Sequence, residues 1–201
     1  MRAGAVAAVT CAIALASAVP AQAQAQRTGG AAYGQSTEGP PPAPAPRPEL
    51  LPAAGPVVPG AVAVIDPATG LAAAPADAPL IVQRIVWAGN QLVGKPYRYG
   101  GGHRRGFVDT GYDCSGTLSY ALAGAGLLGA PRDSRTFARF GRPGEGVWVT
   151  VWTNPGHAFM EVAGIRLDTS AAGDPSGAKG PRWRAVLRRT DGFVARHPRG
   201  L

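Results

Sequence analysis

The sequence predicts an α+β domain in which two helices precede an antiparallel β-sheet. Two apolar runs, at residues 80–93 and 114–128, have the length and spacing of helices. Three later runs, between residues 146 and 170, alternate apolar and polar residues and are separated by short turn sequences. Helices that come first and strands that follow are typical of an α+β domain rather than of alternating βαβ units.

The first helix is expected in "PLIVQRIVWAGNQLVG", where apolar residues recur at the spacing of an amphipathic helix: Leu80, Ile81, Ile85, Val86, Ala88 and Leu92. Gly94 and Pro96 are expected to end this helix. The sequence that follows, "YRYGGGHRRGFVDTGYD", is predicted to be a glycine-rich loop.

The second helix is expected to begin at Cys114 and to reach Leu128, with Asp113 or Ser115 as its N-cap and Gly129-Ala130-Pro131 as its end. The unpaired amides and the aligned peptide dipoles of a first helical turn favour negative charge, so a thiol at Cys114 should ionise readily. The carboxylate of Asp113 opposes this effect, unless it turns away to cap the helix or holds a cation of a ligand.

The strands are expected in "GVWVTVW", "HAFMEVAG" and "IRLDTS", with turns at residues 154–156 and 163–164. A two-residue turn at 163–164 places His157 and Asp168 on the same face of the hairpin, as diagonal neighbours. The Asp168 carboxylate can then orient the imidazole of His157. The alternative is that Asp168 pairs with Arg166 or a nearby arginine on a solvated face. His103 and His197 are expected to be exposed loop residues.

The N-terminal part of the chain has a different composition from this domain. Residues 1–23 contain Arg2, an apolar run and alternating small residues near Ala21 and Ala23, a pattern typical of a cleaved secretion signal. We therefore expect a secreted, periplasmic or cell-envelope-associated protein without a stable membrane span after cleavage. Residues 24–79 are rich in Ala, Pro, Gly and Gln and are predicted to be a disordered linker, with a possible extra strand at 58–70. The folded domain is expected at residues 80–201.

The expected domain is basic. It carries 17 Lys and Arg residues against 8 Asp and Glu residues, a net charge of +9, whereas the linker carries 2 against 4. Such a surface suits an anionic partner, and for a secreted protein we favour the anionic cell envelope. Scattered arginines that only keep the domain soluble are the alternative. Nucleic acid is not an expected partner, because the arginines are dispersed and no aromatic–basic recognition motif is found.

Cys114 is the only cysteine expected in the mature protein, because Cys11, the other cysteine of the chain, lies in the predicted signal. A single cysteine cannot form an internal disulfide. It is therefore buried and inert, paired with another molecule, or a reactive thiol. A reactive thiol needs a base, and histidine is the usual one.

Four motifs resemble those of the NlpC-type cysteine peptidases, papain-like hydrolases of bacterial cell-wall peptides: "GKPYRYGG", "YDCSG", "GHAFMEVAG" and "IRLDTS". The resemblance covers nearly all of residues 80–201 and none of the linker. It implies a papain-like fold, in which the nucleophile stands at a helix N-terminus packed on an antiparallel meander. The C-terminal stretch "GPRWRAVLRRTDGFVARHPRGL" differs from the family pattern, as does "GEGVWVTVW".

The resemblance also implies roles for individual residues. Cys114 matches the family nucleophile and His157 the base, while Asp168 stands where the family has a third polar residue, more often His, Asn or Gln. Three further residues match positions that, in some members, help to bind the free amine and nearby polar groups of a stem peptide: Tyr97, Asp113 and Ser115. The partner implied is the peptidoglycan stem peptide, typically cut between D-glutamate and a diamino acid.

The expected function is therefore hydrolysis by a Cys/His thiol mechanism. Neither a metal nor another cofactor is expected, because one cysteine, three dispersed histidines and no H-E-x-x-H motif give no zinc pattern. Two alternatives stay open. The domain is a non-catalytic peptidoglycan-binding module that keeps a papain-like groove, or the same thiol serves an amidase or an acyl transfer to an amine or a lipid.

Overall fold

A computed structural model of the chain describes residue 50 and residues 55–201. The predicted signal at residues 1–23 and most of the predicted linker lie outside the described residues. Within the described part, the helices are α1 (Leu80–Asn90), α2 (Cys114–Gly124) and the short α3 (Ser134–Phe137). No helix in residues 55–201 has the length and apolarity needed to cross a membrane.

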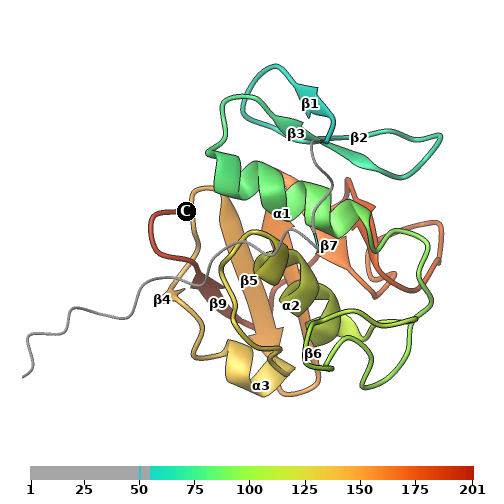
Figure 1. Cartoon of the computed structure of the whole chain (residues 1–201), viewed down its shortest axis with the longest axis vertical. Coiled ribbons are helices and arrows are strands. Elements are labelled where there is room, and N and C mark those ends of the chain that lie inside the picture. The colour runs from blue at the N-terminus through green and yellow to red at the C-terminus, as the bar shows by residue number, and fades with distance from the viewer. Residues whose placement is uncertain (1–49, 51–54) are drawn as a thin grey trace, which may run out of the picture. The chain divides into compact units, whose positions relative to one another are not determined.

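A six-stranded antiparallel sheet forms the centre of the fold (Figure 1). The strands run in the order β4-β9-β5-β6-β7-β8. Their bounds are β4 (Arg142–Pro143), β5 (Val149–Asn154), β6 (His157–Val162), β7 (Ile165–Asp168), β8 (Arg182–Arg184) and β9 (Val194–His197). The predicted α+β class is therefore confirmed. The last strand in sequence, β9, lies inside the sheet between β4 and β5.

The predicted hairpin is present with the predicted register. Val162 pairs with Ile165 and Glu161 pairs with Arg166 across the β6–β7 turn. The two turn residues, Ala163 and Gly164, have φ values of 48° and 85°. Positive φ at both central positions is the geometry of a two-residue hairpin turn whose twist matches that of the strands. This register fixes which side chains of β6 and β7 share a face.

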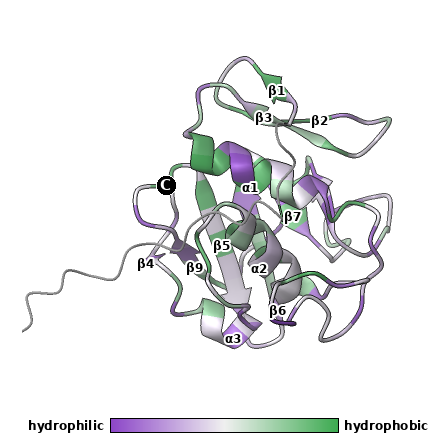
Figure 2. Ribbon diagram, viewed as in Figure 1, coloured by the Kyte–Doolittle hydropathy of each residue, from purple (hydrophilic) through white to green (hydrophobic). Residues whose placement is uncertain are grey.

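Helices α1 and α2 lie on one face of the sheet (Figure 1). Every residue of α2 is buried, because α1 covers one side of it and β6 the other. A helix that is buried on all sides shows no polar stripe, whereas α1 changes between apolar and polar along its ribbon (Figure 2). Because α2 is buried, its first residue, Cys114, is held rigidly.

Helix α2 is shorter than the sequence predicts, because it ends at Gly124 and not at Leu128. Gly126 adopts a positive φ of 78°. The amide of Gly126 donates to the carbonyl of Ala123, and the amide of Leu127 donates to that of Leu122. This pair of bonds satisfies the last carbonyls of the helix in a Schellman motif. The predicted stop at residues 129–131 is therefore wrong.

The predicted linker boundary at residue 79 is also wrong for the described chain. Residues 55–79 contain β1 (Val57–Val58), β2 (Val64–Ile65) and β3 (Ala72–Pro75), which form a second, three-stranded sheet. Strand β3 packs on α1, and the Asn90 side chain both donates to the carbonyl of Ala72 (2.8 Å) and accepts from its amide (2.9 Å). Small alanine side chains let β3 approach the helix closely. The possible strand at 58–70 contains β2.

Candidate active site

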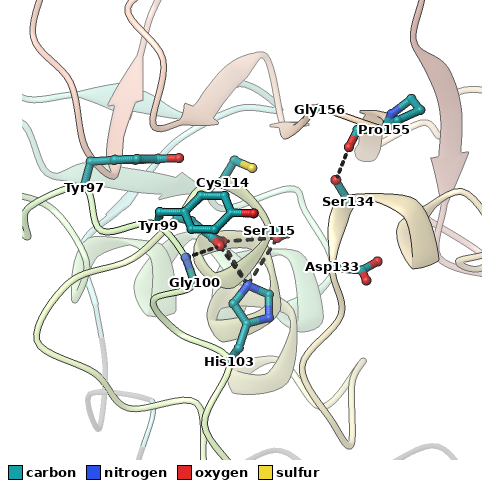
Figure 3. A pocket seen from close by; sticks show the side chains of 11 residues that line it. Tyr97, Tyr99, Gly100, His103, Cys114, Ser115, Asp133, Ser134, Pro155 and Gly156 are labelled. Atoms are coloured by element: carbon teal, nitrogen blue, oxygen red, sulfur yellow. Dashed lines mark hydrogen bonds and ion pairs between the residues drawn. The ribbon is translucent and has the colours of Figure 1, made fainter.

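Cys114 lies at the start of α2 and forms part of the wall of a cavity of about 380 Å³ (Figure 3). Its side chain is 9% exposed. The N-cap is Asp113, as predicted, and its Oδ1 accepts from the Gly116 amide at 2.7 Å. Ser115, the alternative cap, instead donates to Asp113 Oδ1 at 3.1 Å. The thiol thus stands where the helix start faces a cavity, and it is not enclosed in the apolar core.

His157 begins β6 and contacts Asp168, the last residue of β7. Its Nε2 lies 2.9 Å from Asp168 Oδ1, so Nδ1 is the ring nitrogen left for the thiol. Burial lowers the pKa of His157, but hydrogen bonding to Asp168 and to the Cys114 side chain outweighs it and raises the pKa to about 9. The imidazole is therefore protonated at neutral pH and can stabilise a thiolate at Cys114.

Asp168 is fully buried, and each of its oxygens has its own partners. Oδ1 accepts from the Ser170 amide at 2.8 Å in addition to contacting His157. Oδ2 accepts from Arg188 Nη1 at 3.1 Å and lies 3.5 Å from Arg166 Nε. Burial raises the pKa of Asp168, but the hydrogen bonds from His157 and Ser170 and the charge of Arg166 lower it below its usual value. Asp168 thus contacts His157 through one oxygen and arginines through the other, but on a buried face and not on the solvated face of the alternative.

The predicted peptide-binding residues Tyr97, Asp113 and Ser115 all line the same cavity as Cys114. Figure 3 shows Tyr97 and Ser115 beside Cys114. Tyr97 is half exposed, and its pKa is raised by burial and by the negative charge of Cys114 and Asp113. The structure thus brings these three residues together beside the thiol. Tyr99, which is 91% exposed, lines the same cavity.

The carboxylate of Asp113 is occupied by the protein itself. Besides the bonds from Gly116 and Ser115, its Oδ2 accepts from the Gly100 amide at 3.0 Å. His103 Nε2 lies 3.0 and 3.1 Å from the two oxygens. Burial raises the pKa of Asp113, but these partners lower it below its usual value. The residue is therefore a helix cap whose carboxylate oxygens are both engaged by partners within the protein.

His103 is the site residue that the sequence analysis missed, because the prediction of an exposed loop position is wrong. The Asp113 hydrogen bond raises the pKa of His103 despite the opposing effect of burial. The glycine-rich loop folds back over the start of α2, and a Cβ at Gly116 would contact the Gly101 carbonyl. That close approach brings His103 to Asp113. The third histidine, His197, contacts the Gly144 carbonyl at 3.0 Å and does not line the cavity.

Within residues 55–201 no group of three or more His, Cys, Asp or Glu side chains is placed to hold a metal ion. The chemistry that the described arrangement offers is that of a thiol beside an imidazolium, which a buried carboxylate orients.

No protein-family model and no curated protein matches the chain. Solved structures do show similarity. The peptidoglycan hydrolase RipB from Mycobacterium tuberculosis is 27% identical, with a TM-score of 0.44 over 58% of this chain and 64% of RipB. Rv1477, a hypothetical invasion protein of the same bacterium, is 24% identical, with a TM-score of 0.41 over 58% of this chain and 62% of that protein.

A mutated form of RipA, the Resuscitation Promoting Factor Interacting protein, is 23% identical to this chain. Its TM-score is 0.41, over 59% of this chain and 62% of RipA. The chain therefore spans less than two thirds of the length of each of these three structures.

Proposed function

We propose that the chain is a secreted cell-wall hydrolase that cleaves peptidoglycan stem peptides with the thiol of Cys114. The observation that carries the proposal is the arrangement of Cys114, His157 and Asp168. A thiol at a helix start, a protonated imidazole beside it and a buried carboxylate at 2.9 Å from that imidazole are the parts of a cysteine hydrolase.

In the proposed first step, the Cys114 thiolate attacks the carbonyl carbon of a peptide bond in the stem peptide. The oxyanion that forms is stabilised by the positive end of α2 and by backbone amides at the helix start, including that of Cys114. The carbon–nitrogen bond then breaks as the imidazolium of His157 gives its proton to the leaving amine. The acyl half remains on Cys114 as a thioester.

In the second step, the now neutral His157 takes a proton from water, and the resulting hydroxide attacks the thioester. The carboxylic acid leaves, and the thiolate and the imidazolium are restored. Asp168 keeps the imidazole in one orientation through both steps, because its own carboxylate is fixed by Ser170 and Arg188.

The substrate class rests on the motifs that resemble the NlpC-type peptidases and on the basic surface, which suits an anionic cell envelope. The cavity beside Cys114 is open and lined by two tyrosines, and an extended peptide can enter it. We propose the D-glutamyl–diamino acid bond as the one cleaved. RipB is described as a peptidoglycan hydrolase, and the proposal assigns the same class of activity to this chain.

The proposal is tested by incubating purified peptidoglycan with the full chain and with Cys114→Ala, followed by mass spectrometry of the fragments. We expect new fragment pairs that differ from the parent by one added water, and none with the variant. Fragments that carry a transferred acyl group show an acyltransferase instead. Unchanged fragments contradict the proposed hydrolase. If the chain still binds the wall after its thiol is alkylated, it is a binding module.

A further inference from the structure

The C-terminal segment, residues 186–197, passes directly beside the His157–Asp168 pair. Its strand β9 pairs with β5, with Trp152 opposite Ala195 and Thr153 opposite Val194. This pairing brings the residues just before β9 to the side of the sheet where His157 begins β6. The segment belongs to the part of the sequence that departs from the NlpC-type pattern, so the resemblance assigns it no role.

Arg188 of this segment donates to Asp168 Oδ2 from Nη1 at 3.1 Å. Its side chain is only 16% exposed. The guanidinium carbon lies 4.8 Å from the ring centroid of Phe159 and 5.2 Å from that of Phe193. Two aromatic faces and one carboxylate thus fix the guanidinium in a single position.

The same two phenylalanines contact the imidazole of His157. The His157 and Phe159 rings are stacked at 6.3 Å between centroids, and Phe193 meets His157 edge-on at 6.4 Å. Phe193 also meets Phe159 edge-on at 5.2 Å. One aromatic cluster therefore holds both the imidazole and the guanidinium that share the Asp168 carboxylate.

The charged groups around this pair come from four parts of the fold. Asp168 and the Cys114 thiol face His157, and both raise its pKa. Arg166 of β7, Arg184 of β8 and Arg188 surround Asp168.

The three arginines are not equivalent in their hydrogen bonding. Arg166 gives its hydrogen bond to the Ala172 carbonyl at 2.7 Å. Arg184 donates to the Ala178 carbonyl and pairs with Asp174. Arg188 alone among them donates a hydrogen bond to Asp168 in the described part of the chain.

We propose that Arg188 is a positioning residue, which holds Asp168 so that Oδ1 faces His157 Nε2 and the other ring nitrogen faces the thiol of Cys114. The C-terminal segment is then part of the active centre. The effect on the rate rests on the proposed function, because it needs a hydrolytic reaction as its readout. The effect on the titration of His157 does not rest on the proposed function.

Arg188→Met removes the donor and the charge but keeps a flexible apolar side chain for the two rings. The hydrogen bond and the charge of Asp168 raise the pKa of His157 to about 9, so a carboxylate that turns away from Nε2 lowers this pKa. Loss of the Arg188 charge with Asp168 still in place would raise the pKa of His157 instead. Loss of the hydrogen bond frees the carboxylate to rotate and misplaces the imidazole. We expect kcat to fall about tenfold to a hundredfold with KM nearly unchanged.

The test is an NMR titration of His157 in the full chain, with its ring signal identified by its absence from His157→Gln, together with hydrolysis kinetics on the stem peptide. Arg189→Met is the matched control, because Arg189 is the next residue, has a side chain that is 92% exposed and pairs with Asp191 at the surface. We expect Arg189→Met to change neither the His157 titration nor kcat. Arg188→Gln removes the same charge and replaces Arg188→Met if that variant does not fold.

A downward shift of the His157 titration together with a loss of kcat supports the proposal. An unchanged or raised His157 titration in a folded Arg188 variant overturns it, because Asp168 then keeps its place beside His157 without Arg188. A downward shift without any loss of kcat also overturns the positioning role. If the wild-type chain hydrolyses no stem peptide, the proposed function fails, and the titration still decides whether Arg188 acts on the pair.

Discussion

The imidazole Nε2 of His103 lies 3.0 Å from the carboxylate of Asp113, the residue directly before Cys114, which we propose as the nucleophile. This contact joins the glycine-rich loop to the cap of α2 in the wall of the cavity (Figure 3). It also occupies the carboxylate that the family resemblance assigns to a substrate amine. A substrate amine that binds Asp113, as the resemblance implies, would compete with His103 for the same carboxylate.

We predict that His103→Gln lowers KM for a stem peptide with a free amino terminus about threefold, because the Asp113 carboxylate in the cavity wall loses a competing partner. An N-acetylated form of the same peptide should show no change. His197→Gln is the matched control, because His197 lies outside the cavity. An equal change of KM for both peptides would show that Asp113 does not receive the amine.

The stability of the helix start depends on Asp113. Its Oδ1 accepts the Gly116 amide at 2.7 Å in a buried setting, so we expect Asp113→Ala to lower the free energy of unfolding by about 2 kcal/mol. Asp133→Ala removes the exposed cap of the short helix α3 and should cost about 0.5 kcal/mol. Urea denaturation followed by circular dichroism measures both. Equal losses would contradict a special role of the buried cap.

The pH profile of hydrolysis should report the protonation of His157. Because its pKa is raised from 6.5 to about 9, kcat/KM should fall as the pH rises through about 9 and the imidazolium loses its proton. The same shift stabilises the fold. Its contribution to the free energy of unfolding is complete below about pH 6.5 and is lost as the pH rises to about 9.

Asp168→Asn should move the alkaline limb of kcat/KM to lower pH, because the hydrogen bond and the charge of Asp168 both raise the pKa of His157. Asp174→Asn is the control, since Asp174 also pairs with a buried arginine, Arg184, but does not contact His157. An alkaline limb that stays at the same pH in Asp168→Asn would show that Asp168 does not control the histidine.

The close contact between α2 and the glycine-rich loop predicts a steric effect at Gly116. A Cβ there would meet the Gly101 carbonyl and stand 3.0 Å from Gly102 Cα. Gly116→Ala should therefore destabilise the domain by about 3 kcal/mol or separate the loop from the helix. In Gly156→Ala, the nearest atom is Asn154 Oδ1 at 3.7 Å, so little change is expected. Thermal unfolding measures both variants. Equal midpoints for Gly116→Ala and Gly156→Ala would contradict the packing described.

Local patterns account for the parts of the site that the sequence could predict. The two-residue turn at Ala163-Gly164 and the period of two in a strand fix the faces of β6 and β7, and this placed His157 near Asp168. An aspartate directly before a buried apolar run identified the start of α2. These features depend on residues that are close in sequence, so they can be recognised without the fold.

The features that were missed depend on contacts between distant residues. His103 reaches Asp113 only because the loop folds back on α2, and Arg188 reaches Asp168 because β9 inserts beside β5. No local pattern signals either contact. Strand β3 was missed because its alanine-rich sequence gives no alternation, and it is stabilised by α1 through the side chain of Asn90.

The nucleophilic role of Cys114 is tested most directly by intact-protein mass spectrometry on the full chain, quenched in acid during hydrolysis of a stem peptide. We expect a species heavier by the acyl half of the peptide, attached to Cys114 as a thioester. Cys114→Ala should show neither this adduct nor any product. Release of product by the folded Cys114→Ala variant at the wild-type rate would contradict the role of the thiol.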